Sequence, residues 1–260
     1  MRNNKFLDNL CLLIVFIFLF LPILVLIIFS FNTSRLNIMF EGFTLRWYYE
    51  LFHNSLLLEA LFNTLMVAVI STLVSVIIGT VSSYALKKFE FPGKKFINEL
   101  LYIPVVIPEI VLGISLLCIY SFMKIELGMF TLILSHIAFS IPFVIINVNS
   151  VMDMMNPHLE EAANDLGASK LTTFFKVVLP SLVPGILSGA QLAFTLSLDD
   201  VVISYFTAGP DSNTLPLQVF SMIKTGVTPD VNALITLMLL MIFISLFVSM
   251  SLSLRKMRRG

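Results

Sequence analysis

Long apolar runs alternate along the chain with short polar segments. Six runs are long enough to cross the hydrocarbon core of a bilayer, which takes about 20 apolar residues per helix. Strands of a membrane barrel would alternate apolar and polar positions over about ten residues, whereas these runs are apolar on all sides. We therefore predict an all-α polytopic membrane protein in which residues 1–260 form one membrane domain. The six predicted transmembrane helices cover residues 10–31, 61–86, 100–122, 127–149, 182–206 and 231–254.

The composition agrees with a membrane environment. Hydrophobic residues make up 58% of the chain and charged residues 12%, about half of the roughly 25% that is typical of soluble domains. The formal net charge is zero, which argues against nucleic acid as a partner. Cys11 and Cys118 lie within apolar runs, and His53, His136 and His158 have no metal-ligand spacing. We therefore expect no metal site and no disulfide framework.

The basic residues indicate how the spans are oriented. If the N-terminus is cytoplasmic, four of the sixteen Lys and Arg residues fall in outer segments and the other twelve in cytoplasmic segments. Basic residues gather on the cytoplasmic side of membrane proteins. We therefore predict a multi-pass protein of the cell inner (cytoplasmic) membrane with both termini in the cytoplasm. The four basic residues of the outer segments are Arg35, Arg46, Lys124 and Lys224.

The first outer loop, residues 32–60, contains a stretch rich in aromatic side chains. Trp47, Tyr48 and Tyr49 stand beside a few charged residues, a pattern typical of segments that lie in the membrane interface. One interpretation is that this stretch anchors the loop at the membrane surface. The sharper interpretation is that Trp47 lines an outer vestibule of a transport pathway.

The segment 153–180 joins the fourth and fifth predicted spans on the cytoplasmic side. Asn156 is a good N-cap, and Pro157 suits the first position of a helix. Glu160 and Glu161 would lie near the positive end of the helix dipole. The segment therefore predicts a short helix held outside the membrane.

A second short helix is expected to follow the first. Gly167 fits the left-handed position that ends a helix, and Ser169 can cap the next one before Pro180 leads into the fifth span. Ala162 and Ala163 leave part of the first helix bare, so another protein could approach its backbone closely. The alternative is that this is an ordinary long loop that folds into two helices without docking to anything.

Three parts of this segment stand at fixed spacings: Glu161-Ala162-Ala163, Gly167, and Val177-Val178-Leu179-Pro180. The pattern resembles the EAA motif of ABC-importer permeases, with Val177 in place of the usual Ile. The resemblance implies a type I ABC-importer permease fold and a coupling helix, Glu161 through Gly167, that docks into a groove on a separate ATPase subunit. The residues expected to couple the chain to the ATPase are Glu160, Glu161, Ala162, Ala163, Gly167, Leu179 and Pro180.

The C-terminal third carries a second resemblance. Residues 196–206 read Leu-Ser-Leu-Asp-Asp-Val-Val-Ile-Ser-Tyr-Phe, and Gly209-Pro210, Leu215-Pro216 and Asn232-Ala233-Leu234 follow. These stretches are similar to the second permease of spermidine/putrescine importers, the PotC type, and to a putrescine-specific sister permease. The resemblance implies that the chain forms part of a membrane pathway for polyamines and is itself no enzyme.

The same resemblance implies several partners besides the lipid bilayer. They are two ABC ATPase subunits, a non-identical sister permease and an extracytoplasmic polyamine-binding protein. The chain contains no Gly-x-x-x-x-Gly-Lys-Ser/Thr phosphate loop. ATP and Mg²⁺ are therefore expected on the partner ATPase, and this chain is expected to hold no cofactor.

Three acidic residues, Glu109, Asp199 and Asp200, fall within predicted spans that contain no Lys or Arg. A carboxylate at the bilayer centre costs about 2.5–3.5 kcal/mol, so such a group usually faces a cavity or a partner. A polyamine would supply the missing positive charge. Alternatively, the carboxylates pair with the sister permease and only hold the assembly together. The predicted pathway residues are Asp199, Asp200, Glu109, Trp47, Ser197 and Tyr205.

Two other functions compete with polyamine import. The first is an ABC-importer permease for another solute, such as ferric iron or an organic phosphonate, because the coupling loop would be shared. The second is an ion-coupled secondary transporter that uses the three carboxylates as proton sites. Secondary transporters usually contain repeats across two halves, and no convincing self-similarity is visible in this sequence.

Overall fold

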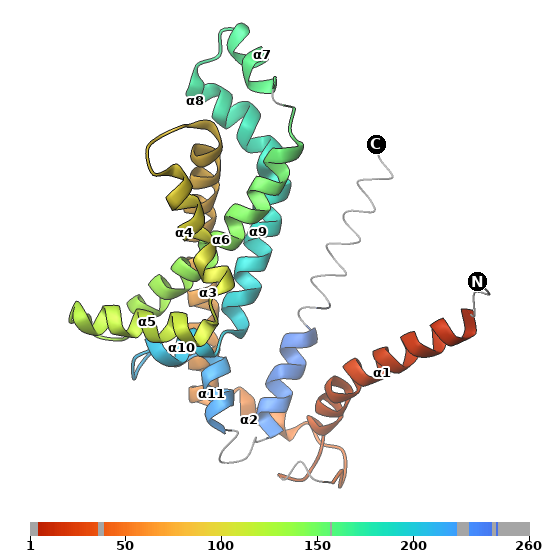
Figure 1. Cartoon of the computed structure of the whole chain (residues 1–260). Coiled ribbons are helices and arrows are strands. Elements are labelled where there is room, and N and C mark those ends of the chain that lie inside the picture. Colours follow the sequence, from red (N-terminus) through yellow and green to blue (C-terminus); the bar gives the residue numbers. More distant parts are fainter. Residues whose placement is uncertain (1–4, 36–38, 157, 223–228, 241–242, 244–260) are drawn as a thin grey trace. The chain divides into compact units, whose positions relative to one another are not determined.

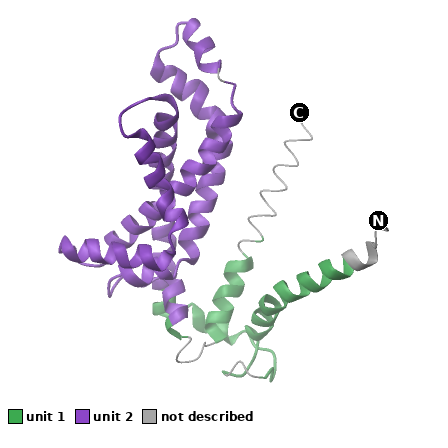
Figure 2. Cartoon of the chain, in the orientation of Figure 1, with its two compact units in different colours: residues 1–58, 221–260 green, residues 59–220 purple. Residues whose placement is uncertain are grey.

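The computed structural model describes residues 5–35, 39–156, 158–222, 229–240 and 243. Within these ranges the chain is helical and contains no strand, and a single isolated antiparallel bridge joins Asn32 to Phe43. This confirms the all-α prediction for the described residues. The chain divides into two compact units: unit 1 contains residues 1–58 and 221–260, and unit 2 contains residues 59–220 (Figure 2).

Unit 1 contains two labelled helices and one shorter apolar helix. They are α1 (Lys5–Phe29), α2 (Arg46–Leu51) and the helix Pro229–Leu240. No residue of the apolar stretch Asn9–Phe29 of α1 is buried, so its surface is free to meet lipid or another protein chain. The sixth predicted span, 231–254, coincides at its start with the helix Pro229–Leu240, and the remainder lies almost entirely outside the described residues.

Unit 2 contains the other labelled helices, and Figure 1 shows α7 and α8 at one end of it and α10 towards the other. The first of these helices, α3, begins four residues before unit 2 starts at Glu59, and α11 continues slightly beyond the other boundary. The bounds are α3 Ser55–Lys88, α4 Lys94–Val106, α5 Glu109–Phe122, α6 Met129–Met154, α7 Leu159–Asp165, α8 Lys170–Thr173, a π-helical turn Phe174–Val178, α9 Leu179–Asp199, α10 Val202–Thr207 and α11 Leu215–Met222.

Four helices among the described residues are long and apolar enough to cross a membrane, and a bent pair would make a fifth. The prediction of six transmembrane helices is therefore not confirmed. The bent pair replaces the third predicted span, 100–122, because α4 and α5 meet at 114°. Ile107 and Pro108 between them are extended, as expected because a proline disfavours helical backbone in the residue before it. The four continuous spans are Asn9–Phe29, Ser55–Lys88, Met129–Met154 and Lys170–Asp199.

The fifth predicted span, 182–206, also differs from the structure. The helix that contains it starts earlier, at Lys170, and includes α8, the π-helical turn and α9. It ends at Asp199, where the backbone becomes extended before α10 begins at Val202. The predicted single helix is thus interrupted at Asp200, within the acidic pair.

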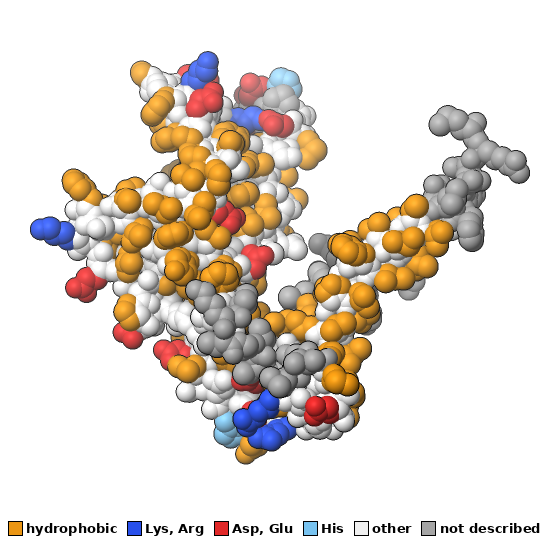
Figure 3. Space-filling model, turned by 60° about the horizontal axis from the view of Figure 1, so that its bottom comes forward, with side chains coloured by type: hydrophobic (Ala, Val, Ile, Leu, Met, Phe, Trp, Pro, Cys, Tyr) orange, Lys and Arg blue, Asp and Glu red, His pale blue; other side chains and the backbone are white. Residues whose placement is uncertain are grey.

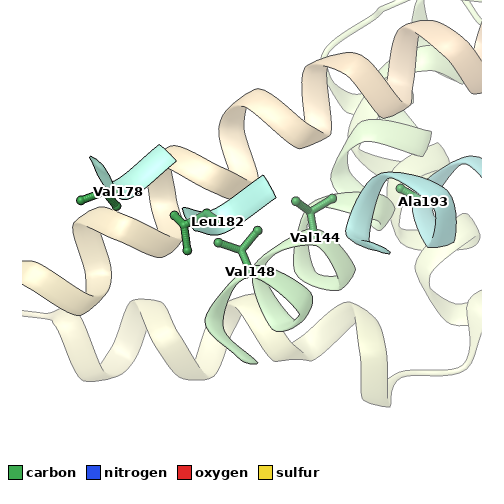
Figure 4. Close-up of a cluster of buried hydrophobic side chains, with 5 residues drawn as sticks. All are labelled: Val144, Val148, Val178, Leu182 and Ala193. Carbon is green, nitrogen blue, oxygen red and sulfur yellow. The ribbon is translucent and has the colours of Figure 1, made fainter. Parts of the chain in front are cut away.

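The packing of α6 against α9 forms the core of unit 2. Buried aliphatic side chains from the two helices and from the π-helical turn meet there, as Figure 4 shows. Glycines bring the backbones close: a Cβ on Gly185 would lie 2.8 Å from the carbonyl oxygen of Asn147, and one on Gly189 would lie 3.0 Å from the Cα of Val144. Small residues allow this close approach of membrane helices. The labelled core residues are Val144, Val148, Val178, Leu182 and Ala193.

The surface of the described chain is largely apolar. In Figure 3, hydrophobic side chains cover much of the visible face, and several basic and acidic side chains gather near its margins. Large hydrophobic side chains are exposed along α1, α3, α4 and α5. A surface of this kind suits lipid and neighbouring protein chains, since a water-soluble monomer rarely exposes such large apolar areas.

Candidate functional site

The first candidate site is the break between α9 and α10, where the acidic pair lies. Asp199 is the last residue of α9, and Asp200 has an extended backbone (φ −64°, ψ 124°). The Asp200 carboxylate turns back onto α10: Oδ1 accepts a hydrogen bond from the Ile203 amide at 3.2 Å, and Oδ2 accepts from the Ser204 amide at 2.7 Å. Asp200 therefore satisfies free amides at the start of α10, as capping side chains do.

A buried histidine from α6 completes this break. His136 is 1% exposed, and its Nδ1 lies 2.7 Å from Ser197 Oγ on α9. Its Nε2 lies 3.1 Å from Ser204 Oγ on α10 and 3.5 Å from Asp200 Oδ2. Ser197 also lies 3.3 Å from Ser71 Oγ on α3. The polar network thus joins α3, α6, α9 and α10 inside unit 2.

The two members of the acidic pair have different surroundings. The side chain of Asp200 is only 3% exposed and is bound on several sides, whereas Asp199 is exposed. Glu109, at the start of α5, is exposed as well, and the charges of Asp199 and Asp200 act on its carboxylate. The structure therefore brings the three predicted acidic residues together and leaves two of them open to the surroundings.

The helix α10 is also fixed to α5 and α6. A Cβ on Gly113 of α5 would lie 2.7 Å from the ring of Phe206, so α10 packs directly on that glycine. At the other end of α10, Thr131 Oγ1 donates a hydrogen bond to the carbonyl oxygen of Thr207 at 2.8 Å. The neighbouring Tyr205 is 63% exposed and makes an edge-on ring contact with Phe206. An exposed aromatic side chain thus lies on the same short helix that Asp200 caps.

Besides Asp200, two other predicted pathway residues are buried in the packing of the protein. Ser197 bonds within the network around His136. Trp47 is buried in unit 1, where its Nε1 donates to the carbonyl oxygen of Asn32 at 2.5 Å. This hydrogen bond fixes α2 to the segment that follows α1, while the role of Trp47 in an outer vestibule remains a prediction.

Sequence reasoning considered His136 only as a metal ligand and therefore missed its place beside Asp200. A signal for it was present in the sequence. His136 lies in one apolar run, and the acidic pair Asp199–Asp200 lies in another apolar run with no basic residue to pair with. A buried carboxylate requires hydrogen-bond donors, and a histidine in a neighbouring span can supply one.

The second candidate site is the loop of α7 and α8, at the other end of unit 2. The side chain of Asn156 accepts a hydrogen bond from the His158 amide at 3.0 Å, before α7 begins at Leu159. At the end of α7, the Gly167 amide donates to the Asn164 carbonyl at 2.9 Å and the Ala168 amide donates to the Ala163 carbonyl at 3.1 Å. These two bonds form a Schellman motif.

Two of the predicted local signals, at Gly167 and Ser169, are confirmed. The predicted start of the first helix is wrong: α7 begins at Leu159 with His158 in the N-cap position, and Asn156 lies before it. Pro157 lies outside the described residues. Gly167 has φ +84°, in the left-handed region that glycine adopts most readily. Ser169 caps α8 by accepting a hydrogen bond from the Thr172 amide at 3.3 Å. Thr173 Oγ1 donates to Asn164 Oδ1 at 3.2 Å and so connects α8 to α7. The loop is therefore folded by its own residues into two short helices at a sharp turn.

The loop is fastened to α3 through one of its two adjacent glutamates. Glu160 forms an ion pair with Lys88 and accepts a hydrogen bond from the Tyr84 hydroxyl at 3.2 Å. The ring of Tyr84 packs on that of Phe174, with centroids 4.8 Å apart. Glu161 points elsewhere: it is largely exposed and contacts His158 at 2.8 Å. Glu160 therefore attaches the loop to α3, whereas Glu161 is left on the exposed surface of the loop.

The outer face of the loop carries large apolar side chains that sequence reasoning did not single out. Leu166 is 90% exposed and Leu171 is 73% exposed. Ala162 is also exposed, and Ala163 is half-buried. The signal for these leucines is that they are apolar residues within a segment too polar to lie in the membrane. Exposed apolar side chains rimmed by charges are typical of a protein–protein contact.

Leu179 and Pro180 lie at the start of α9, directly after the π-helical turn. Pro180 has no N–H group to donate to the carbonyl of Lys176, so the regular hydrogen-bond pattern is interrupted where the wide turn occurs. Leu179 is half-buried and Pro180 is exposed. These two residues shape the passage from the loop into the long helix, and the exposed face of the loop lies on α7 and α8.

Comparison with known proteins gives one family. The family model described as "Binding-protein-dependent transport system inner membrane component" matches residues 75–259. The spermidine/putrescine transport system permease protein PotC of Escherichia coli K12 is 42% identical over 220 residues, which cover 85% of this chain and 83% of that protein. PotC of Haemophilus influenzae is 38% identical over 236 residues (91% and 92%). The putrescine transport system permease protein PotI of Escherichia coli K12 is 38% identical over 218 residues (81% and 78%).

Two solved structures share the fold. A chain of a bacterial ABC transporter that imports the acidic polysaccharide alginate has a TM-score of 0.73 at 16% identity, covering 96% of this chain and 98% of that one. A chain of the alginate ABC transporter in complex with a periplasmic protein bound to an alginate pentasaccharide has a TM-score of 0.67 at 19% identity, covering 93% of each chain. Both likenesses concern the fold alone.

Proposed function

Because the chain belongs to the family of binding-protein-dependent transport system inner membrane components, and within it to the PotC-type permeases, we propose that it forms part of the membrane pathway for spermidine and putrescine in an ATP-driven importer. The observation that carries this proposal is the 42% identity to PotC over 85% of the chain. The chain has the fold of a type I ABC-importer permease. In this proposal the chain lines the substrate pathway and supplies the helices that move during transport. ATP is hydrolysed on a partner subunit.

The acidic site supports a cationic substrate. Asp199 and Glu109 are exposed carboxylates that lie within electrostatic reach of each other. A polyamine carries spaced ammonium groups, each of which can donate charge-assisted hydrogen bonds to such carboxylates. The exposed ring of Tyr205 adds an aromatic surface suited to a cation. Asp200 supports the site from inside, since it caps α10.

The loop of α7 and α8 is the proposed contact with an ATPase subunit. It exposes two large apolar side chains, Leu166 and Leu171, and the acidic side chain of Glu161. The ion pair of Glu160 with Lys88 connects the loop to α3, and the helix from Lys170 to Asp199 connects it to the acidic site. Movement of the ATPase would thus be transmitted through these helices and alternately open the pathway to either side.

The proposed complex contains further partners. They are two ATPase subunits, a non-identical sister permease and an extracytoplasmic polyamine-binding protein. A binding protein is in keeping with the family description and with the periplasmic protein bound in one of the alginate transporter structures. ATP and Mg²⁺ would bind to the ATPase subunits.

The proposed orientation places the loop of α7 and α8, and both chain termini, in the cytoplasm. Single cysteines test it in a chain whose exposed Cys11 and Cys118 are replaced by serine. A cysteine introduced by Lys94→Cys should react with an impermeant reagent only after the cells are opened. One introduced by Asp211→Cys should react in intact cells. Labelling of the Lys94→Cys variant in intact cells would contradict this orientation.

The proposed transport function is tested by uptake of labelled spermidine and putrescine in cells that lack their own polyamine uptake and express this chain with its partners. We expect uptake that stops when ATP is depleted and continues when the ion gradient is collapsed. Excess ferric iron or organic phosphonate should not compete. Uptake that follows the ion gradient would point to a secondary transporter, and competition by either other solute would point to a different substrate.

A further inference from the structure

His136 lies at the junction of four helices, yet transport chemistry gives it no role. We propose that His136 is a positioning residue for substrate: it fixes the start of α10 to α6 and α9, and so keeps Asp200 inside the protein and Asp199 at the exposed end of α9. This inference rests on the proposed function, because it assigns Asp199 to the pathway. It adds that His136 determines the position of the Asp199 carboxylate.

One set of hydrogen-bond directions satisfies every side chain around the imidazole. An ionised Asp200 can only accept, so the Ser204 hydroxyl donates its single proton to Oδ2 at 2.7 Å. Ser204 Oγ must then accept from His136, whose Nε2 lies 3.1 Å away. In the tautomer that carries its proton on Nε2, Nδ1 accepts, and the Ser197 hydroxyl donates to it at 2.7 Å. All four side chains are satisfied by one consistent arrangement.

The two nitrogens of His136 bind on opposite sides of the helix break. Nδ1 contacts Ser197, two residues before the end of α9, and Nε2 contacts Ser204 and Asp200 after it. The other bonds of Asp200 are all to α10 itself, from Ile203 and Ser204. They therefore hold α10 together but do not attach it to a neighbour. The imidazole provides that attachment.

The far end of α10 is held separately. Thr131 of α6 binds the Thr207 carbonyl at 2.8 Å, and Phe206 packs on Gly113 of α5. Loss of the imidazole would therefore release only the start of α10, together with the backbone of Asp200 and Asp199. The expected result is a protein that still folds and assembles but presents Asp199 in the wrong place. This differs from the collapse expected when a core residue is lost.

Two substitutions separate the nitrogens of the ring. In His136→Gln, the amide reaches the place of Nε2 and keeps the bond to Ser204. In His136→Asn, the amide reaches only the place of Nδ1 and keeps the bond to Ser197. We expect the KM for spermidine uptake to rise about tenfold in His136→Asn, which equals about 1.4 kcal/mol, and to rise no more than about threefold in His136→Gln. In both variants kcat and the amount of assembled complex should be retained.

A second pair of variants leaves the histidine in place. Ser204→Ala removes its partner on α10, and Ser197→Ala removes its partner on α9. We expect Ser204→Ala to raise the KM as His136→Asn does, and Ser197→Ala to resemble His136→Gln. Equal KM values for His136→Asn and His136→Gln would overturn the proposal. So would a loss confined to the amount of complex, because it would show that the ring only fills space.

The position of residue 199 can also be measured without any substrate. In a chain with Cys11 and Cys118 replaced by serine, the cysteine of Asp199→Cys is labelled with a cationic thiol reagent. Its labelling rate should change about fivefold when His136→Asn is added and stay unchanged with His136→Gln. An equal rate in both backgrounds would contradict the positioning role. If the unmodified complex takes up no polyamine, the proposed function fails, and the labelling rates still decide where His136 holds this residue.

Discussion

Two helix junctions of unit 2, the one between α7 and α8 and the one between α9 and α10, are built in opposite ways. The turn between α7 and α8 is closed by neighbours in sequence, namely Gly167, Ser169 and Asn164, and it is exposed. The break between α9 and α10 is closed by His136 from a distant helix, and it is buried. The difference follows from solvent, because water can satisfy backbone groups at the exposed turn and cannot reach those at the buried break.

The same contrast separates the proposed roles of the two places. A turn that is stabilised by its own residues can move as a rigid body together with a docked partner without losing its structure. This suits a coupling loop. A break that depends on four helices holds its residues only while those helices stay in register, which suits a site that must change between two states of a transporter. The contrast can be tested at two glycines of unit 2: Gly209, which packs against backbone just after α10, and Gly167, which lies in the exposed turn.

The largest expected effect is at Gly209, just after α10. A Cβ there would lie 2.1 Å from the carbonyl oxygen of Leu127, and backbone cannot move aside as a flexible side chain can. We expect Gly209→Ala to destabilise the folded protein by about 3 kcal/mol and to reduce the yield of monodisperse protein in detergent. Gly128→Ala is the matched control, because nothing lies within 4 Å of its Cβ. Equal yields of the two variants would contradict the tight packing at this end.

A smaller effect is expected at Gly167, where the backbone rather than space limits the side chain. Its φ is +84° and nothing lies within 4 Å of an added Cβ. A β-branched residue in this conformation costs about 1–3 kcal/mol, so Gly167→Val should lower transport about tenfold at an unchanged yield of protein. Gly167→Asn should stay within about threefold, because Asn tolerates left-handed backbone. Identical transport by both variants would remove the turn from the coupling mechanism.

The smallest expected effect is at the ion pair that fastens the loop of α7 and α8, the proposed coupling loop, to α3. Lys88 and Glu160 are partly exposed, so we expect Lys88→Ala to weaken the attachment by about 1 kcal/mol and uptake per ATP hydrolysed to fall about fivefold. The exchange Lys88→Glu with Glu160→Lys should restore coupling. Lys87→Ala is the control, since its pair with the more exposed Asp153 should matter less. A double exchange as poor as the single variant would argue against the ion pair.

The sequence predicted the turn between α7 and α8 better than the acidic site for a physical reason. The cap at Ser169 and the glycine at position 167 act over a few residues, so their effect is readable from the chain alone. The fourth span was predicted as 127–149 and is observed as Met129–Met154, because its apolar run determines it. The ion pair of Glu160 with Lys88 joins residues far apart in sequence and could not be read in this way.

The break at Asp200 was not predicted, because no proline or glycine marks it. An unbroken apolar helix through 182–206 satisfies local preferences equally well. The structure stops that helix because Asp200 finds donors on α10 and a partner on α6. The third span was different: its bend follows from Pro108, a local cause that the sequence contains although the angle of 114° depends on packing.

The most direct test of the central claim is ATP-dependent uptake of labelled spermidine, measured per assembled complex in proteoliposomes, for the unmodified chain and for Asp199→Asn. This substitution keeps the size of the side chain and removes its charge. The account predicts ATP-dependent uptake by the unmodified complex, about tenfold lower uptake by Asp199→Asn, and equal amounts of assembled complex. ATP-dependent uptake that is the same for both would remove Asp199 from the pathway, and the absence of any spermidine uptake by the unmodified complex would contradict polyamine import itself.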